Sequence, residues 1–219
     1  MLSKTNKVLK PYNKLDDIID SKVKVKIARL FISRAENFKA PGREIANLIG
    51  VSAPAAHAAL KELHKHNILF LELIGKQHIY RLNVKNRFVE DILAPIFKKE
   101  SLLAKDVIKF IKDAVMRSAV KAKIVSIILY GSLQRGRMRD GSDVDVAVII
   151  KNSDDLSIVE KMFDEFITGL FYERFGLHID LYIKAEEEFI RRVTKKLSPV
   201  ESLLENYSVI YGKDPLDMV

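Results

Sequence analysis

Two apolar runs in the second half of the chain have the length and composition of buried strands. Residues 124–130 read Ile-Val-Ser-Ile-Ile-Leu-Tyr, and residues 143–150 read Asp-Val-Asp-Val-Ala-Val-Ile-Ile. β-Branched residues dominate both runs, and a polar stretch that contains glycines separates them. Because side chains alternate along a strand, Asp143, Asp145 and Ala147 are predicted to share one face of the second strand.

The first hundred residues have the period of amphipathic helices, followed by two short runs typical of strands. The helices are predicted over 23–38, 43–49 and 53–67, and the strands over 68–74 and 78–82. Ser52 is the expected N-cap of the third helix, with Pro54 in its first turn. Gly75, Lys76 and Gln77 separate the two strands, so a hairpin with a flexible basic tip is expected.

The remaining segments are predicted mainly from helical periodicity. Residues 1–20 are expected to form an extended arm or a short helix, and a connecting helix over 86–99 is expected to bend at Pro95. Further helices are predicted over 101–119, from Asp154 or Asp155 to near Gly176, from Glu186, and over 200–211, where the helix runs into a short strand. The run 178–184 reads as a strand with His178, Asp180 and Tyr182 on one face.

Candidate chemistry lies where the first two predicted strands meet. Two carboxylates on an apolar strand are unfavourable to bury without a partner, and a divalent cation such as Mg²⁺ or Mn²⁺ is the simplest compensation. Gly131 allows a tight turn, and Ser132 is the expected N-cap of a short helix over 133–138. A helix start of this kind binds phosphate, so the pattern outlines a site for a nucleoside triphosphate.

Gly131-Ser132, ten intervening residues and then Asp143-Val144-Asp145 resemble the signature of the nucleotidyltransferase superfamily, which has a polymerase-beta-like fold. Arg135-Gly136, and Ser142 before Asp143, are similar to the minimal branch, whose pattern reads G-S-x-A-R-G and then S-D-x-D. Gln134 departs from that pattern, which has Ala there. The resemblance covers the chain from about Asp106 to its end. The alternative, a hairpin with an acidic outer face, is disfavoured because Val and Ile surround both aspartates.

The resemblance implies transfer of a nucleoside monophosphate from a nucleoside triphosphate, expected to be ATP, with two Mg²⁺ or Mn²⁺ ions. It implies catalytic and metal-binding roles for Asp143, Asp145 and Asp180, and nucleotide binding by Gly131, Ser132 and Arg135. Arg135 would neutralise the leaving pyrophosphate, although three nearby arginines equally fit a solvated basic loop. The acceptor stays open: a protein side chain, as in minimal antitoxins that adenylylate a toxin partner, a small molecule such as an aminoglycoside, or a nucleic-acid end.

Residues 43–69 resemble the core of small prokaryotic regulators of the winged helix-turn-helix type, and the order of the predicted elements agrees. In that interpretation the helix after Ser52 enters the major groove of DNA. The expected DNA contacts are Ser52, Ala53, Ala55, Ala56, His57 and Lys61, with Lys76 on the wing near phosphate. This face is poor in Arg and Asn, so docking to a protein is the alternative. His57, His64 and His66 are expected to be surface residues.

Charge is distributed unevenly. Residues 1–100 hold 19 basic and 10 acidic residues, a net charge of +9, whereas residues 101–219 carry −1. This asymmetry favours a nucleic-acid-binding module joined to a nearly neutral one. The chain has no cysteine, which excludes disulfides and thiolate metal sites. Residues 1–14 lack the apolar core of a secretory signal and no apolar run reaches eighteen residues, so a cytoplasmic protein without a membrane partner is expected.

The expected fold class is α+β. A winged helix-turn-helix domain over 1–85 is joined by a helix over 86–100 to an α/β nucleotidyltransferase domain with a mixed sheet over 101–219. The functional expectation is a Mg²⁺-dependent nucleotidyltransferase coupled to a DNA-binding domain. The alternative is a regulator of transcription whose nucleotidyltransferase domain only senses nucleotide. Apolar helices over 86–119 offer a surface for a homodimer.

Overall fold

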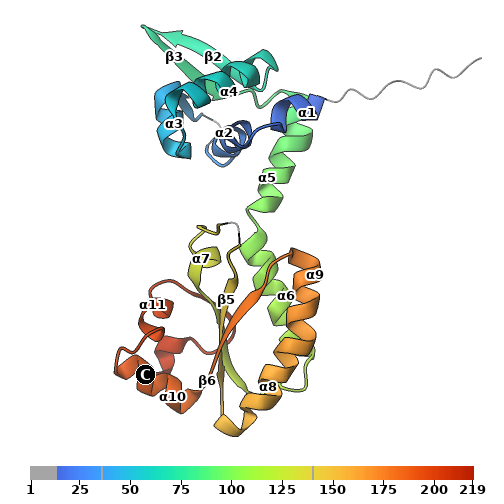
Figure 1. Cartoon of the computed structure of the whole chain (residues 1–219), viewed down its shortest axis with the longest axis vertical. Helices are drawn as coiled ribbons and strands as arrows, with labels where there is room; N and C mark the ends of the chain where they lie inside the picture. The colour runs from blue at the N-terminus through green and yellow to red at the C-terminus, as the bar shows by residue number, and fades with distance from the viewer. Residues whose placement is uncertain (1–13, 36, 140) are drawn as a thin grey trace, which may run out of the picture. The chain divides into compact units, whose positions relative to one another are not determined.

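The computed structural model of the chain describes residues 14–35, 37–139 and 141–219 (Figure 1). The chain divides into two compact units: unit 1 ends at Ser101, and unit 2 begins at Leu102. Within the described ranges, no helix has the length and apolar character needed to cross a lipid bilayer. The expected features of residues 1–13 lie outside the described residues.

Unit 1 combines helices with a small antiparallel sheet. Its elements are α1 (Lys14–Ile19), α2 (Lys22–Ile32), β1 (Lys39–Pro41), α3 (Gly42–Ile49), α4 (Ala53–Lys65), β2 (Leu69–Ile74), β3 (Gln77–Leu82), the π-helical turn η1 (Val89–Leu93) and α5 (Ala94–Glu100). The strand order is β1-β3-β2, and the β2–β3 hairpin extends beyond the helices that it packs against (Figure 1). The two predicted strands of this hairpin are therefore confirmed.

The core of unit 1 follows the predicted helical stripes. Ile27 and Phe31 of α2 pack with Leu60 and Leu63 of α4, and the Tyr80 ring of β3 joins the same cluster. The Ser52 side chain accepts a hydrogen bond from the backbone N–H of Ala55, so the predicted N-cap of α4 is confirmed. Such a cap satisfies one of the N–H groups that a helix start leaves without a partner.

One helix predicted in unit 1 was wrong in its boundary, and another contains a turn that was not predicted. The helix expected over 23–38 ends at Ile32, and Lys39–Pro41 forms β1, which pairs with β3 through Ala40 and Tyr80. A strand of three residues is too short to show alternation, and only its pairing defines it. The helix expected over 86–99 is confirmed in its extent, because residues 87–100 are helical throughout, but it contains the π-helical turn η1 just before α5, with Pro95 in the first turn of α5. Because proline lacks an N–H, the α-helical hydrogen bonding is interrupted at this point.

Unit 2 is built on a four-stranded mixed sheet. Its helices are α6 (Leu103–Arg117), η2 (Lys121–Lys123), α7 (Gly131–Gln134), η3 (Ser153–Asp155), α8 (Leu156–Met162), η4 (Phe163–Thr168), α9 (Gly169–Phe175), α10 (Glu186–Thr194), α11 (Val200–Leu204) and η5 (Pro215–Met218). Its strands are β4 (Ile124–Leu129), β5 (Val144–Ile150), β6 (Ile179–Ala185) and β7 (Ser208–Gly212), in the order β6-β5-β4-β7. Only β5 and β6 are parallel. The expected mixed sheet is confirmed.

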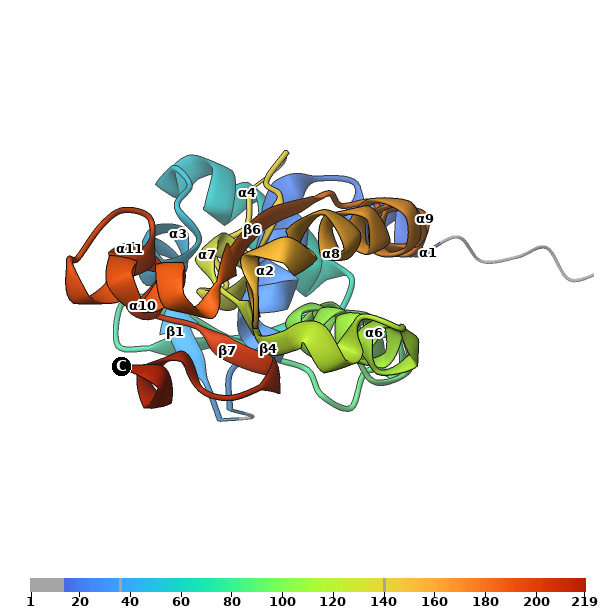
Figure 2. The same ribbon diagram turned by 90° about the horizontal axis from the view of Figure 1, so that it is seen from below.

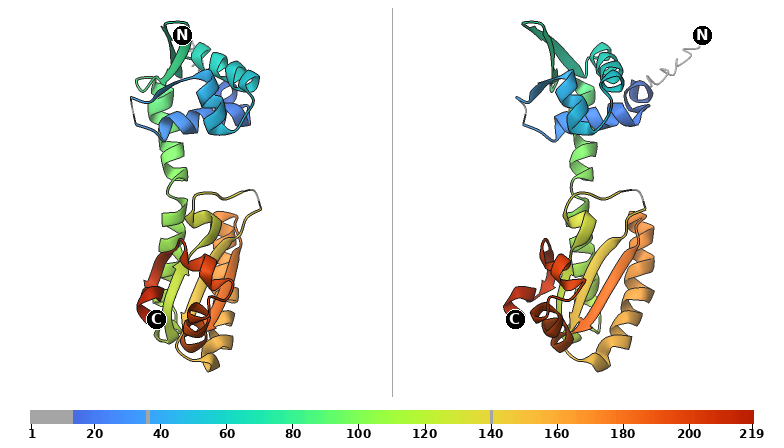
Figure 3. Two further views of the ribbon diagram at one scale, coloured as in Figure 1. Left: turned by 90° about the vertical axis from the view of Figure 1, so that its left-hand side faces the viewer. Right: turned by 60° about the vertical axis from the view of Figure 1, so that its left-hand side comes forward.

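The two faces of this sheet are covered by different helices (Figures 2 and 3). Val146 and Val148 of β5 pack with Phe163 and Phe171 in the larger cluster, on the side of α6, α8 and α9. Ala147 lies in a separate, smaller cluster on the side of α10 and α11. Asp145 alternates with Val146, so it lies on the face that carries Ala147.

Two segments predicted in unit 2 have the expected extent, and one of them contains a π-helical turn that was not predicted. The helix expected to end near Gly176 is divided into α8 and α9 by the π-helical turn η4. The prediction that a helix from residue 200 runs into a short strand by residue 211 is confirmed, since α11 ends at Leu204 and Ser208–Gly212 forms β7 against β4. Apolar periodicity does not distinguish an α-helix from one with an inserted π-turn, because both keep an apolar face toward the sheet.

Candidate functional site

Asp145 and Asp180 lie on neighbouring strands at the same level. The parallel pairing of β5 and β6 places Asp145 directly opposite Asp180. Neighbouring strands lie about 4.8 Å apart, so the two carboxylates project from one face of the sheet at close range. Asp143 comes one residue before β5 begins at Val144, and its side chain is exposed. The strand register therefore brings together two of the three predicted acids.

The carboxylate of Asp145 is half-buried and surrounded by charged and polar groups. The Ser132 backbone N–H donates a hydrogen bond to Asp145 Oδ2 at 3.4 Å. Burial raises the pKa of the Asp145 carboxyl, and the negative charges of Asp180 and Asp143 raise it further. The Ser132 N–H and the positive charge of Arg135 act in the opposite direction on this pKa. Four of the five other predicted site residues therefore affect the pKa of the Asp145 carboxyl, and Gly131 is the exception.

Gly131 is required by its contact with Asp145. Its backbone has a φ of +73°, and a Cβ atom there would lie 1.8 Å from Asp145 Oδ2. Any side chain at this position would collide with the carboxylate. A backbone hydrogen bond also connects the start of α7 to β5, because the Tyr130 N–H donates to the Asp145 carbonyl oxygen at 3.1 Å.

The predicted capping role of Ser132 was wrong. Helix α7 begins at Gly131, its N-cap is Tyr130, and no side chain caps it. The helix expected over 133–138 therefore starts two residues earlier and ends at Gln134. The left-handed conformation of Gly131 turns the chain into the helix before Ser132, and Gly136, with a φ of +62°, follows the helix end. Ser132 contributes its backbone N–H to Asp145 rather than a side-chain cap.

The donor chemistry of the acids suits a divalent cation, because Mg²⁺ and Mn²⁺ prefer carboxylate oxygens. Asp143 and Asp180 are exposed, so both are accessible to a ligand. Within the described ranges, however, no three His, Asp or Glu side chains are arranged closely enough to hold a metal ion. Like charges repel one another, and neighbouring carboxylates turn apart unless a cation lies between them.

Two tyrosines beside the acids were not among the predicted site residues. Tyr130 and Tyr182 pack at the edge of the apolar cluster that contains Ala147. Burial, and then the charges of Asp145 and Asp180, raise the pKa of Tyr130 to about 12. The Tyr182 hydroxyl is buried and has no hydrogen-bond partner among the described residues. The alternation over 178–184 predicted that Tyr182 shares a strand face with Asp180. That pattern was the sequence signal for placing Tyr182 near the acids.

The predicted DNA contacts of unit 1 lie around the start of α4 and the hairpin tip. Ser52, Ala53, His57, Lys61 and Lys76 are exposed, and Ala55 is half-buried. The prediction for Ala56 was wrong, because its side chain is 0% exposed and belongs to the core. His57 and His64 are exposed as expected, and His66 is half-buried.

Comparison with known proteins supports a nucleotidyltransferase domain. Residues 109–210, just under half of the chain, match the family model of the nucleotidyltransferase domain. No curated protein matches the sequence.

Three solved structures show weak likeness to parts of the chain. The AntR antimony-specific transcriptional repressor is 13% identical, covers 48% of this chain and 96% of its own, and has a TM-score of 0.34. A possible transcriptional regulator from Methanosarcina mazei Go1 is 14% identical, and the match covers 45% of this chain and 96% of the regulator, with a TM-score of 0.29. A toxin-antitoxin with AMP-PNP is 14% identical, and the match covers 49% of this chain and 82% of the other, with a TM-score of 0.30.

Proposed function

We propose that unit 2 is a Mg²⁺-dependent nucleotidyltransferase that moves a nucleoside monophosphate from a nucleoside triphosphate, with ATP as the expected donor, to a hydroxyl acceptor. The observation that carries this proposal is the pairing of Asp145 with Asp180 beside the Gly131–Ser132 turn. Asp145 and Asp180 lie side by side next to the Gly131–Ser132 turn, Asp143 precedes the same strand by one residue, and all three belong to a segment that matches a nucleotidyltransferase domain. Carboxylates placed together on a sheet rich in apolar residues are unfavourable without a cation.

Asp143, Asp145 and Asp180 would hold the Mg²⁺ or Mn²⁺ ions, which supply stabilisation of the negative charge at the transferred phosphoryl group. The acceptor hydroxyl attacks the α-phosphorus, the bond from that phosphorus to the bridging oxygen breaks, and pyrophosphate leaves. The exposed Asp180 orients the acceptor hydroxyl and accepts its proton.

The turn between β4 and α7 binds the other end of the triphosphate. The Gly131 N–H and the Ser132 hydroxyl would contact the β- and γ-phosphates, while the Ser132 N–H remains bonded to Asp145 and the missing Gly131 side chain leaves room for that carboxylate. The exposed Arg135 neutralises charge on the departing pyrophosphate, and its effect on the pKa of Asp145 is consistent with this position.

Unit 1 is proposed to be a DNA-binding winged helix-turn-helix. Its helices α2, α3 and α4 and its hairpin follow the order of that fold, and α4 presents exposed Ser52, Ala53, His57 and Lys61 near its start. Lys76, exposed at the hairpin tip, suits a phosphate contact. The net charge of +9 in residues 1–100 supports binding to a polyanion.

The test uses ATP labelled at the α-phosphate, Mg²⁺ and a cell lysate with the full chain. We expect label to be transferred to an acceptor by the native protein and by Asp113→Asn, a substitution at an exposed aspartate of α6. Asp143→Asn and Asp145→Asn should reduce the transfer by at least about a thousandfold. The labelled product distinguishes a protein such as a toxin partner, an aminoglycoside-like small molecule and a nucleic-acid end. Equal transfer by all four proteins would reject the proposal.

A nucleotide sensor that regulates transcription is the second candidate. ATP binding without label transfer, together with DNA retardation that changes with ATP, would support the sensor over the transferase.

A further inference from the structure

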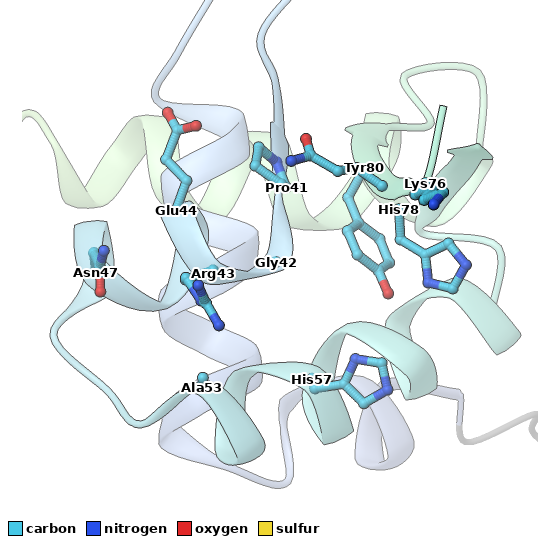
Figure 4. Close-up of a pocket in the computed structure, with 11 residues that line it drawn as sticks. Pro41, Gly42, Arg43, Glu44, Asn47, Ala53, His57, Lys76, His78 and Tyr80 are labelled. Carbon is cyan, nitrogen blue, oxygen red and sulfur yellow. The ribbon is translucent and has the colours of Figure 1, made fainter. Parts of the chain in front are cut away.

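A pocket in unit 1 lies between the start of α3, the first half of α4 and the β2–β3 hairpin (Figure 4). Its volume is about 570 Å³, within the range of roughly 300–1,000 Å³ that is typical of sites for small organic ligands. The side chains of Arg43, His57 and Tyr80 point toward its centre in Figure 4, whereas Glu44 extends away from it. Groups that donate hydrogen bonds or carry positive charge therefore line part of a pocket whose wall is otherwise largely apolar.

Tyr80 places a hydrogen-bond donor on the wall of this pocket. The residue is only 3% exposed, and its ring belongs to the core of unit 1. Its hydroxyl points into the pocket and makes no hydrogen bond to any residue that the structure describes. The pocket leaves this hydroxyl accessible, so it can donate a hydrogen bond to a ligand that enters.

The start of α3 adds further donors. The N-cap of this helix is Pro41, which provides no side-chain hydrogen bond, so the first N–H groups lack a cap. Gly42 lines the pocket, and a Cβ there would lie 3.3 Å from Leu60 Cδ1 and 3.8 Å from Tyr80 Cε2. The missing side chain thus allows the Tyr80 ring to approach the helix start closely. The positive end of the helix dipole and the Tyr80 hydroxyl both favour an anion.

Fixed positive charge surrounds these donors. Arg43 comes from α3 and Lys76 from the hairpin tip, and neither forms an ion pair within the described ranges. His57 and His78 complete the rim from α4 and β3. A phosphate ester matches this arrangement, because it accepts hydrogen bonds from hydroxyl and N–H donors and is attracted by both cations.

We propose that the pocket around Tyr80 binds a phosphate ester, with the Tyr80 hydroxyl and the α3 start as donors and with Arg43 and Lys76 as countercharges. The expected source of the phosphate is the backbone of a DNA duplex, and that part rests on the proposed DNA-binding role of unit 1. A free sugar phosphate shares the same chemistry, and the experiment distinguishes the two sources.

The first arm measures the affinity of the full chain for a mixed-sequence DNA duplex of about 20 base pairs over a series of salt concentrations. Tyr80→Phe should lower the affinity about tenfold, because a hydrogen bond to a charged group is lost, and should leave the salt dependence unchanged. Arg43→Gln should lower the affinity and also reduce the slope of log affinity against log salt by about 1. Arg87→Gln, at a side chain that is 94% exposed in the same unit and outside the pocket, should change affinity little.

The second arm titrates ribose 5-phosphate without metal and follows the imidazole signals of the five histidines by NMR. Signals of His57 and His78 should move, whereas that of His178 in unit 2 should not. Shifts that disappear in Tyr80→Phe, without any duplex binding by the native chain, would assign the pocket to a free phosphate ester and reject the DNA source. Duplex binding that neither variant weakens, with no shift of His57 or His78, would overturn the pocket while leaving the DNA-binding proposal intact. No binding in either arm would reject both.

Discussion

At the scale of single residues, the contact between Gly131 and Asp145 decides how the acids are presented. The alternation of the 143–150 run was sufficient to predict that Asp145 lies on a strand face with Ala147. It could not show that the same carboxylate occupies the space that a Cβ of Gly131, 14 residues earlier in the sequence, would fill, or that it accepts a hydrogen bond from the Ser132 N–H. Such a contact depends on the strand register and the turn together.

Gly131→Ala tests this contact. The new Cβ would collide with Asp145 Oδ2, so we expect label transfer from ATP to fall by at least about a hundredfold, since displacement of a catalytic group by about 1 Å has effects of that size. The matched control is Gly136→Ala, where φ is also positive but no atom lies within 4 Å of the added Cβ. Gly136→Ala should lose about 1–2 kcal/mol of stability in urea unfolding because of its positive φ, and Gly131→Ala should lose more because its Cβ also collides with Asp145. Equal activity of the two variants would contradict the role of the contact.

The raised pKa of Asp145 gives a pH-dependent prediction for stability. A carboxyl whose pKa is higher in the folded than in the unfolded chain contributes stability below the unfolded value of about 3.9, and this contribution is lost as pH rises through the folded value. At pH 7 the ionised Asp145 is therefore unfavourable without a cation. Asp145→Asn should raise the free energy of unfolding at pH 7, and the gain should shrink toward pH 4.

Urea unfolding of the native chain, Asp145→Asn and Asp113→Asn at both pH values provides the measurement. Asp113 is exposed on α6, away from the three acids, so its substitution should have little effect at either pH. A gain for Asp145→Asn that grows as the pH is lowered would show that the direction of the pKa change is wrong.

At the scale of elements, long amphipathic segments were predictable and short or interrupted ones were not. The α4 helix and its Ser52 cap have a local signal, and so has the β2–β3 hairpin. The strand β1 exists only through its pairing with β3, and η4 and η1 insert π-turns without changing the apolar face. The pocket around Tyr80 is formed by α3, α4 and the β2–β3 hairpin together. No local pattern within one of these elements could therefore predict it.

The aromatic side chains of α9 should stabilise the fold of unit 2. Phe171 of α9 is fully buried, with its ring 5.8 Å from that of Phe110 and 4.7 Å from that of Phe175. Phe171→Ala should lower the free energy of unfolding by about 3–5 kcal/mol, because it removes a large core side chain. Leu170→Ala, at a neighbouring side chain that is 49% exposed, should cost less than about 1 kcal/mol. Similar losses in the two variants would show that α9 does not pack as described.

At the scale of the whole molecule, the division at Ser101 and Leu102 coincides with a change in charge. The basic excess belongs to residues 1–100, and the acids of the proposed transferase belong to unit 2. Charge counting and motif spacing were enough to propose this separation of roles. They do not identify the acceptor, which depends on the surface that approaches Asp180.

Two fragments should separate the activities. Residues 1–101 are expected to bind a DNA duplex with an affinity that falls steeply with salt, and residues 102–219 to transfer label from ATP without binding the duplex. Circular dichroism establishes that each fragment is folded before the assays. Duplex binding by the second fragment, at the affinity of the full chain, would contradict the assignment.

The most direct measurement of the central claim is a titration of the full chain with Mn²⁺, followed by electron paramagnetic resonance, in the presence of a non-hydrolysable ATP analogue. If the three acids and the Gly131–Ser132 turn form one site, about two Mn²⁺ ions should bind per chain. Binding should be lost in Asp145→Asn and Asp180→Asn and retained in Asp113→Asn. Identical Mn²⁺ binding by the native chain and all three variants would contradict the claim.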